Sequence, residues 1–87
     1  MIINVKIVNK AGLHARPAAA FVQLANKFKS SVKVKKDDIE VNGKSILGMM
    51  MLGACFGSKI TLKIVGPDEK QVSEELSKLI ENKFGEE

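Results

Sequence analysis

The sequence predicts an α+β fold, a two-layer open-faced sandwich in which a four-stranded antiparallel sheet carries three helices on one face. Two patterns predict it. Four short segments alternate apolar and polar side chains, as half-buried strands do, and three segments repeat apolar side chains at helical spacing. Along the chain they follow the order β-α-β-β-α-β-α. Alternating strands suit a sheet with one wetted face, so the helices share the other face.

The first half of the chain supplies three strands and one helix. Residues 3–7 alternate apolar and polar side chains and indicate the first strand. Residues 16–27 carry apolar side chains three and four residues apart, which indicates an amphipathic helix. Residues 32–35 and 39–41 alternate again and predict two strands, with a turn at residues 37–38 between them.

The second half supplies two helices and the last strand. Ser45 is a good N-cap residue in front of the apolar residues 46–52, which predicts a short helix. Residues 60–64 alternate and indicate the fourth strand. Asp68 is expected to cap the last helix and to form a capping box with Gln71. This helix is expected to end at Gly85, and its inner face is predicted to consist of Val72, Leu76, Leu79, Ile80 and Lys83.

Length and composition fit one small domain over residues 1–87. Of the 87 residues, 45% are hydrophobic and 28% charged, an ordinary globular balance. A domain of this size has little room for a deep cleft, which favours a carrier or binding module over a free-standing enzyme. No apolar run approaches the roughly 18 residues of a membrane span, and we expect no signal peptide. Cys55 is the one cysteine, expected as a buried apolar filler in a cytoplasmic, reduced setting.

The net charge of +4 is compatible with two kinds of partner. The 14 basic residues are scattered along the chain, and the absence of Trp and Tyr leaves few rings on which bases could stack. We therefore expect acidic protein partners, and neither nucleic acid nor a membrane. A small nucleic-acid-binding domain remains the alternative, and it predicts salt-sensitive binding to RNA or DNA.

The most informative segment is residues 12–18, Gly-Leu-His-Ala-Arg-Pro-Ala, where a strand has ended and a helix begins. His14, the one histidine, lies at the helix N-terminus, where backbone N–H groups lack helical partners and favour an anion. Arg16 adds a fixed positive charge suited to phosphate oxygens. Gly12 lets the backbone bend close beneath the imidazole. The candidate anion-binding N-terminus consists of Ala15, Arg16, Pro17 and Ala18.

This pattern favours a phosphoryl acceptor at His14. A neutral imidazole is nucleophilic near pH 7 because its reference pKa is about 6.5. The chain has no second histidine for a metal site, so we expect no metal, and no cofactor either. A general base lacks a nucleophile or acid partner nearby in the sequence. From spacing alone, a surface histidine without a role remains open.

The segment 12–18 resembles the signature of the HPr family, the phosphocarriers of the bacterial sugar phosphotransferase system, and the resemblance in length and element order covers the whole chain. It implies that His14 accepts a phosphoryl group through Nδ1 from enzyme I, itself charged by phosphoenolpyruvate, and passes it to enzyme IIA proteins or domains. It also implies that Arg16 stabilises the phosphate, and that the sheet order is 1-4-2-3. Ala11 departs from the family, which often has a hydroxyl or amide residue there.

Residues 42–48 have two interpretations. Gly-Lys-Ser at 43–45 matches the end of a phosphate-binding P-loop, but Asp38 stands where that motif requires glycine. Ser45 therefore serves as a helix N-cap. The sequence Lys-Ser-Ile-Leu-Gly also resembles the regulatory serine site of HPr from Gram-positive-type bacteria. That resemblance implies phosphorylation of Ser45 by a serine kinase/phosphorylase, with a catabolite-control transcription factor as a further partner. A purely regulatory relative and a nitrogen-related carrier are the alternatives within the family.

The apolar helix at residues 46–52 is expected to expose part of its surface. Only one face of a helix can line the core of a two-layer domain. We therefore predict that some of Leu47, Met50 and Met51 form a docking patch, since flexible methionine side chains suit several partners. A fully buried helix is the alternative. Lys10, Lys27 and Lys44 are candidates for the rim of this patch, and a monomer is the default expectation.

Overall fold

The computed structural model describes residues 1–85 and confirms the predicted order of elements. A short 3₁₀ turn at Lys83–Gly85 follows the last helix. The strands and helices are β1 (Ile2–Lys6), α1 (Ala15–Ala25), β2 (Ser31–Lys36), β3 (Ile39–Asn42), α2 (Ile46–Met51), β4 (Lys59–Val65) and α3 (Glu69–Glu81).

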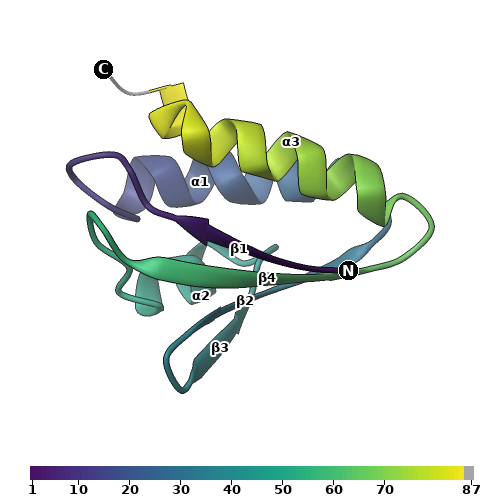
Figure 1. The fold of residues 1–87 in the computed structure, drawn as a ribbon, viewed down its shortest axis with the longest axis horizontal. Coiled ribbons are helices and arrows are strands. Elements are labelled where there is room, and N and C mark those ends of the chain that lie inside the picture. The colour runs from purple at the N-terminus through teal and green to yellow at the C-terminus, as the bar shows by residue number, and fades with distance from the viewer. Residues whose placement is uncertain (86–87) are drawn as a thin grey trace.

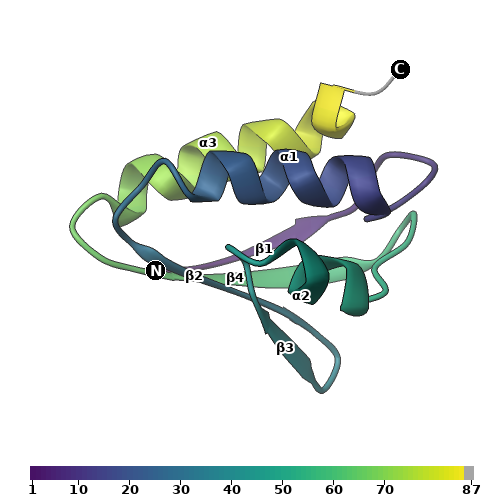
Figure 2. The same cartoon turned by 180° about the vertical axis from the view of Figure 1, so that it is seen from behind.

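The four strands form one antiparallel sheet in the order β1-β4-β2-β3, the order that the family resemblance implies. Leu62 in the centre of β4 lies opposite Ile3 on one side and Val34 on the other. Helices α1 and α3 lie side by side along the same side of the sheet (Figures 1 and 2). Helix α2 packs against α1 and β3. The predicted open-faced sandwich is confirmed.

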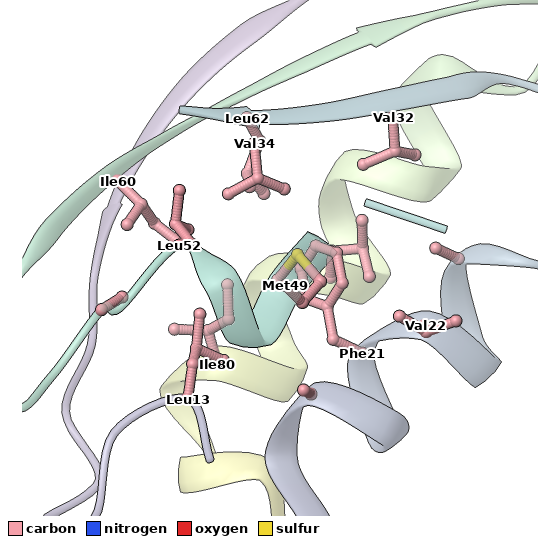
Figure 3. Packing of buried hydrophobic residues seen from close by; sticks show 14 of the residues in the cluster. Leu13, Phe21, Val22, Val32, Val34, Met49, Leu52, Ile60, Leu62 and Ile80 are labelled. Atoms are coloured by element: carbon pink, nitrogen blue, oxygen red, sulfur yellow. The ribbon is translucent and has the colours of Figure 1, made fainter. Parts of the chain in front are cut away.

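The core lies between the sheet and the three helices. Val34 and Leu62 on the sheet, Phe21 on α1 and Met49 on α2 are fully buried (Figure 3), and α3 contributes Ile80. Burial of each such side chain stabilises the fold by roughly 1.5–3 kcal/mol relative to exposure. Strands β2 and β4 and helices α1 and α3 thus turn the apolar stripes predicted from their sequences toward one common centre, whereas Ile39 on β3 is exposed.

All three helices end earlier than predicted, α2 by one residue at Met51. Helix α1 stops at Ala25, two residues short of the predicted end, and the chain tightens there because the Phe28 N–H donates to the Ala25 carbonyl at 3.2 Å. Helix α3 stops at Glu81, ahead of the predicted glycine at 85. Phe84 takes a left-handed conformation with φ of 57°, and its ring is buried against the domain.

The capping box predicted for α3 is wrong. Asp68 is the N-cap residue, but its side chain makes no cap hydrogen bond. Its carboxylate instead accepts hydrogen bonds from the backbone N–H groups of Lys29 and Ser30, each at 3.0 Å, and from the Ser30 hydroxyl. The hydroxyl and these amides hold the pKa of Asp68 below its ordinary value. The carboxylate therefore ties the start of α3 to the segment between α1 and β2.

The predicted burial of Cys55 is also wrong. Cys55 is exposed, and the apolar side chains of Leu52 and Ala54 fill the core at this point instead. The Cys55 N–H donates to the Ser58 hydroxyl at 3.0 Å, which shapes the loop between α2 and β4. Among residues 1–85, no helix is both long enough and apolar enough to cross a membrane.

Candidate functional site at the start of helix α1

The loop between β1 and α1 is held by hydrogen bonds from both sides. Asn9 is fully buried, and its side-chain Nδ2 donates to the Gly12 carbonyl at 2.8 Å, while the Gly12 N–H donates back to the Asn9 carbonyl at 3.2 Å. The Leu13 N–H donates to the Ala54 carbonyl at 2.9 Å, and the Leu13 side chain is buried. The residue before His14 is thus anchored in the core, which fixes where the helix starts.

Gly12 brings this loop against the loop between α2 and β4. Its φ of +70° lies in the left-handed region. A Cβ atom at this position would lie 2.7 Å from the Ala54 carbonyl oxygen and 2.7 Å from the Cα of Cys55, so no other residue fits without moving backbone. The structure places this bend against the loop after α2, and its approach beneath the imidazole stays a prediction.

His14 is the N-cap residue of α1, and its backbone does the capping. Its φ of −79° and ψ of −171° are extended, and its carbonyl accepts the first helical hydrogen bond from the Ala18 N–H at 3.0 Å. The imidazole makes no cap hydrogen bond and is exposed. The ring therefore stands at the helix N-terminus within reach of a macromolecular partner.

The predicted anion-binding N-terminus reduces to two amide donors. The Ala18 N–H is already engaged by the His14 carbonyl, and Pro17 has no N–H. Ala15 and Arg16 carry the remaining N–H groups of the first turn, and both residues are exposed. The first turn of α1 contains no acidic residue, so the Arg16 guanidinium and the helix dipole both favour an anion here.

Ser45 is the N-cap of α2, as predicted. Its Oγ accepts a hydrogen bond from the Gly48 N–H at 3.1 Å. Next to it, the Lys44 ammonium donates to the Phe28 carbonyl at 2.8 Å and so ties this turn to the end of α1. Lys44, a candidate for the patch rim, therefore has a structural contact of its own.

Helix α2 exposes the apolar surface that its sequence predicts. The four exposed residues, here called the α2 patch, lie around the buried Met49, and Leu47 and Met51 are each 68% exposed. Phe56, in the loop after α2, is 61% exposed and was not predicted. Its position in a loop that contains glycines was the sequence feature that could have predicted this exposure. The α2 patch consists of Ile46, Leu47, Met50 and Met51.

A small sandwich that presents one exposed histidine at a helix start, beside an apolar docking surface, defines a carrier domain that meets other proteins. The chain belongs to the HPr family of the phosphotransferase system, because the family model described as "PTS HPr component phosphorylation site" matches residues 3–82. The resemblance inferred from the sequence is thereby confirmed. The chain is accordingly a phosphocarrier component and not a free-standing catalyst.

Individual relatives agree over nearly full length. A phosphocarrier protein HPr from Cupriavidus necator is 50% identical over 80 residues, which are 92% of this chain and 90% of that protein. The crystal structure of HPr from Thermoanaerobacter tengcongensis superposes with a TM-score of 0.95 at 50% identity, covering 100% of this chain and 98% of that one.

The family also includes a regulatory relative. The crystal structure of Crh from Bacillus subtilis, described as a catabolite repression protein and a domain-swapped dimer, has a TM-score of 0.77 at 44% identity and covers 91% of each chain. Phosphocarrier and catabolite-regulation functions thus occur on one fold. Because a relative of this similarity is dimeric, the monomeric state of this chain stays a prediction.

Proposed function

We propose that His14 accepts a phosphoryl group from phosphorylated enzyme I and passes it to enzyme IIA proteins or domains. The observation that carries the proposal is the conformation of His14, whose carbonyl begins the helix while its ring remains exposed. Membership in the HPr family supports the same assignment. The role of Nδ1 as the accepting atom follows from the family resemblance.

The chemistry is a reversible transfer of a phosphoryl group from a phosphorylated donor to the imidazole nitrogen of His14, and from there to an acceptor. The neutral imidazole nitrogen attacks phosphorus, a phosphorus–nitrogen bond forms, and the bond to the donor breaks. The N–H groups of Ala15 and Arg16 and the Arg16 guanidinium would then receive phosphate oxygens. A helix N-terminus stabilises an anion by roughly 0.3–1 kcal/mol at an exposed site. Stabilisation of this size holds the group and still lets it leave.

The proposal is tested by incubating the protein with enzyme I and labelled phosphoenolpyruvate. The wild type is expected to acquire an acid-labile, base-stable label, and His14→Ala is expected to acquire none. This variant keeps the backbone carbonyl of residue 14 that accepts the first helical hydrogen bond, and thermal unfolding checks that its fold is retained. A Ser45→Ala protein, which keeps His14, is the matched control and should be labelled. Label on His14→Ala would place the acceptor elsewhere.

Arg16→Ala is expected to slow transfer more than it lowers stability. A charge-assisted hydrogen bond contributes about 1.5 kcal/mol, which corresponds to roughly a tenfold lower rate. Arg16 is exposed on the first turn, so little packing is lost. Arg16→Lys is the control, because it keeps the positive charge but not the planar guanidinium group. Its transfer rate should lie between those of the wild type and Arg16→Ala. Transfer and stability that fall together would make Arg16 a structural residue.

A second function is supported by the position of Ser45. We propose that phosphorylation of its hydroxyl by a serine kinase/phosphorylase regulates the carrier and favours a catabolite-control transcription factor as partner. Ser45 adjoins the α2 patch, of which Leu47, Met50 and Met51 are the proposed docking residues. A phosphate adds about two negative charges at this edge and would oppose an acidic partner. The similarity to Crh supports this regulation.

A further inference from the structure

The open face of the sheet gathers lysines that are far apart in the sequence. Along each strand, the side chains that alternate with the core residues point away from the helices. In the described part of the chain, Glu40 is the one acidic residue that the strands place on this side, and it pairs with Lys63 at 3.1 Å. The basic face, as we call it, consists of Lys6, Lys33, Lys35, Lys59 and Lys63.

Two pairs of these lysines lie directly opposite each other. Lys6 on β1 is the register partner of Lys59 on β4, and Lys63 on β4 is the partner of Lys33 on β2. Like charges at opposite positions destabilise a sheet, because their side chains are only about 5 Å apart. An anion above the face would relieve this repulsion. The Lys6–Lys59 pair also lines, with Asn4 and Val5, a surface cavity of about 310 Å³.

Helix α3, on the other side of the sheet, carries a net negative charge. Helix α3 carries four glutamates and two lysines, and it lies on the other side of the sheet from the basic face (Figure 1). The net charge of α3 is therefore opposite in sign to that of the basic face. Such a molecule approaches an anionic surface with its sheet toward that surface and with α3 on the far side.

We propose that the basic face docks reversibly on an anionic phospholipid membrane surface, with a headgroup phosphate in the Lys6–Lys59 cavity. Clustered lysines near a membrane are attracted to anionic lipid headgroups. Ile2 and Val65, each 65% exposed, lie at one corner of the same face and would enter the interface. This revises the expectation of no membrane partner, since the fold gathers lysines that the sequence scatters.

The composition of the face favours a membrane over other anions. Lysines also bind nucleic-acid phosphates, but base stacking and base readout need aromatic and arginine side chains. The one arginine, Arg16, lies on α1, and all four phenylalanines lie outside the strands. Protein interfaces have an apolar centre and a polar rim. Here the charges occupy the centre of the sheet, and the two apolar side chains lie at its edge.

The test is co-sedimentation with vesicles, which does not depend on phosphoryl transfer. The wild type should bind vesicles of phosphatidylglycerol and phosphatidylcholine at low salt, and should bind neither pure phosphatidylcholine vesicles nor anionic vesicles at about 0.5 M salt. Lys6→Gln/Lys59→Gln should weaken binding about 30-fold, the effect of two lysines near an anionic membrane. Lys70→Gln/Lys78→Gln removes the same charge from exposed positions on α3 and should bind like the wild type.

Three results would overturn the proposal. One is no binding to anionic vesicles at low salt, and another is equal loss in the two double variants, which would show only an effect of net charge. The third is binding to an RNA or DNA oligonucleotide that depends on the same lysines in the absence of vesicle binding. Lys6→Gln/Lys59→Gln should melt no lower than the wild type, because it removes a repulsion. If it does melt lower, Lys33→Gln/Lys35→Gln replaces it in the same comparison.

Discussion

Helices α1 and α2 begin in different ways, although each begins at a residue proposed to carry phosphate. At α1 the His14 side chain makes no cap hydrogen bond, and the loop before it is held by Asn9, Gly12 and Leu13. At α2 the Ser45 hydroxyl itself accepts the Gly48 N–H. The start of α1 therefore depends on its neighbours, and the start of α2 depends on the residue that would be modified.

This difference separates transfer from stability. Removing the His14 side chain keeps the backbone carbonyl that accepts the first hydrogen bond of α1. Removing the Ser45 hydroxyl takes away a helix cap, so any modification there acts on local structure as well as charge. Transfer at α1 and regulation at α2 are thus expected to respond differently to substitution.

The largest effect is expected where the α1 loop meets its neighbour. Gly12→Ala places a methyl group 2.7 Å from two backbone atoms in a left-handed conformation. We expect the free energy of unfolding to fall by about 1–3 kcal/mol and transfer to fall with it, because the loop before His14 must shift. Urea unfolding and the labelled transfer assay measure the two quantities. Wild-type values for both would show that this loop does not position His14.

Two substitutions of Ser45 should change stability and the transfer rate independently of each other. Ser45→Ala loses the cap and should cost about 1 kcal/mol with transfer by enzyme I unchanged. Ser45→Asp retains a capping side chain and adds a negative charge beside the α2 patch, so stability should hold while transfer slows. Denaturation and transfer rates on both proteins give the comparison. Unchanged transfer in Ser45→Asp would count against regulation by charge at this edge.

The smallest effect is expected for a change in stability at Asp68, the N-cap residue of α3. It extends the comparison to a third helix start. The pKa of Asp68 lies below its ordinary value of 3.8, so its carboxylate stabilises the fold fully above that pH and less as the pH falls through the folded-state pKa. Asp68→Asn should therefore be less stable than the wild type near pH 7. The gap between the two unfolding free energies should narrow as the pH falls below 3.8 and close once the pH is below the lowered folded-state pKa. A gap independent of pH would exclude ionisation as its cause.

Much of the fold could be predicted because its signals are local. The alternation around Val34 and Leu62 and the spacing around Phe21 each identify an element and the face that it buries. The Ser45 cap was predictable for the same reason, since its acceptor and donor are three residues apart. Sheet order came from the family resemblance, because strand pairing joins residues that are distant in the chain.

What was missed depends on distant contacts. The carboxylate of Asp68 has a good local partner in Gln71, yet it bonds to Ser30, which is 38 residues away. Cys55 is exposed in a loop whose backbone lies against the Gly12 bend. The lysines were correctly described as scattered, but strand pairing brings Lys6 beside Lys59. None of these contacts has a periodic signal in the sequence.

The central claim is that His14 is the phosphoryl acceptor, and phosphorus NMR tests it most directly. After incubation with enzyme I and phosphoenolpyruvate, the wild type should show one protein-bound resonance typical of a phosphohistidine substituted at Nδ1. Brief acid treatment should remove it, and His14→Ala should lack it. A phosphoserine resonance alone, or no protein-bound phosphate under conditions in which another HPr is phosphorylated, would contradict the account.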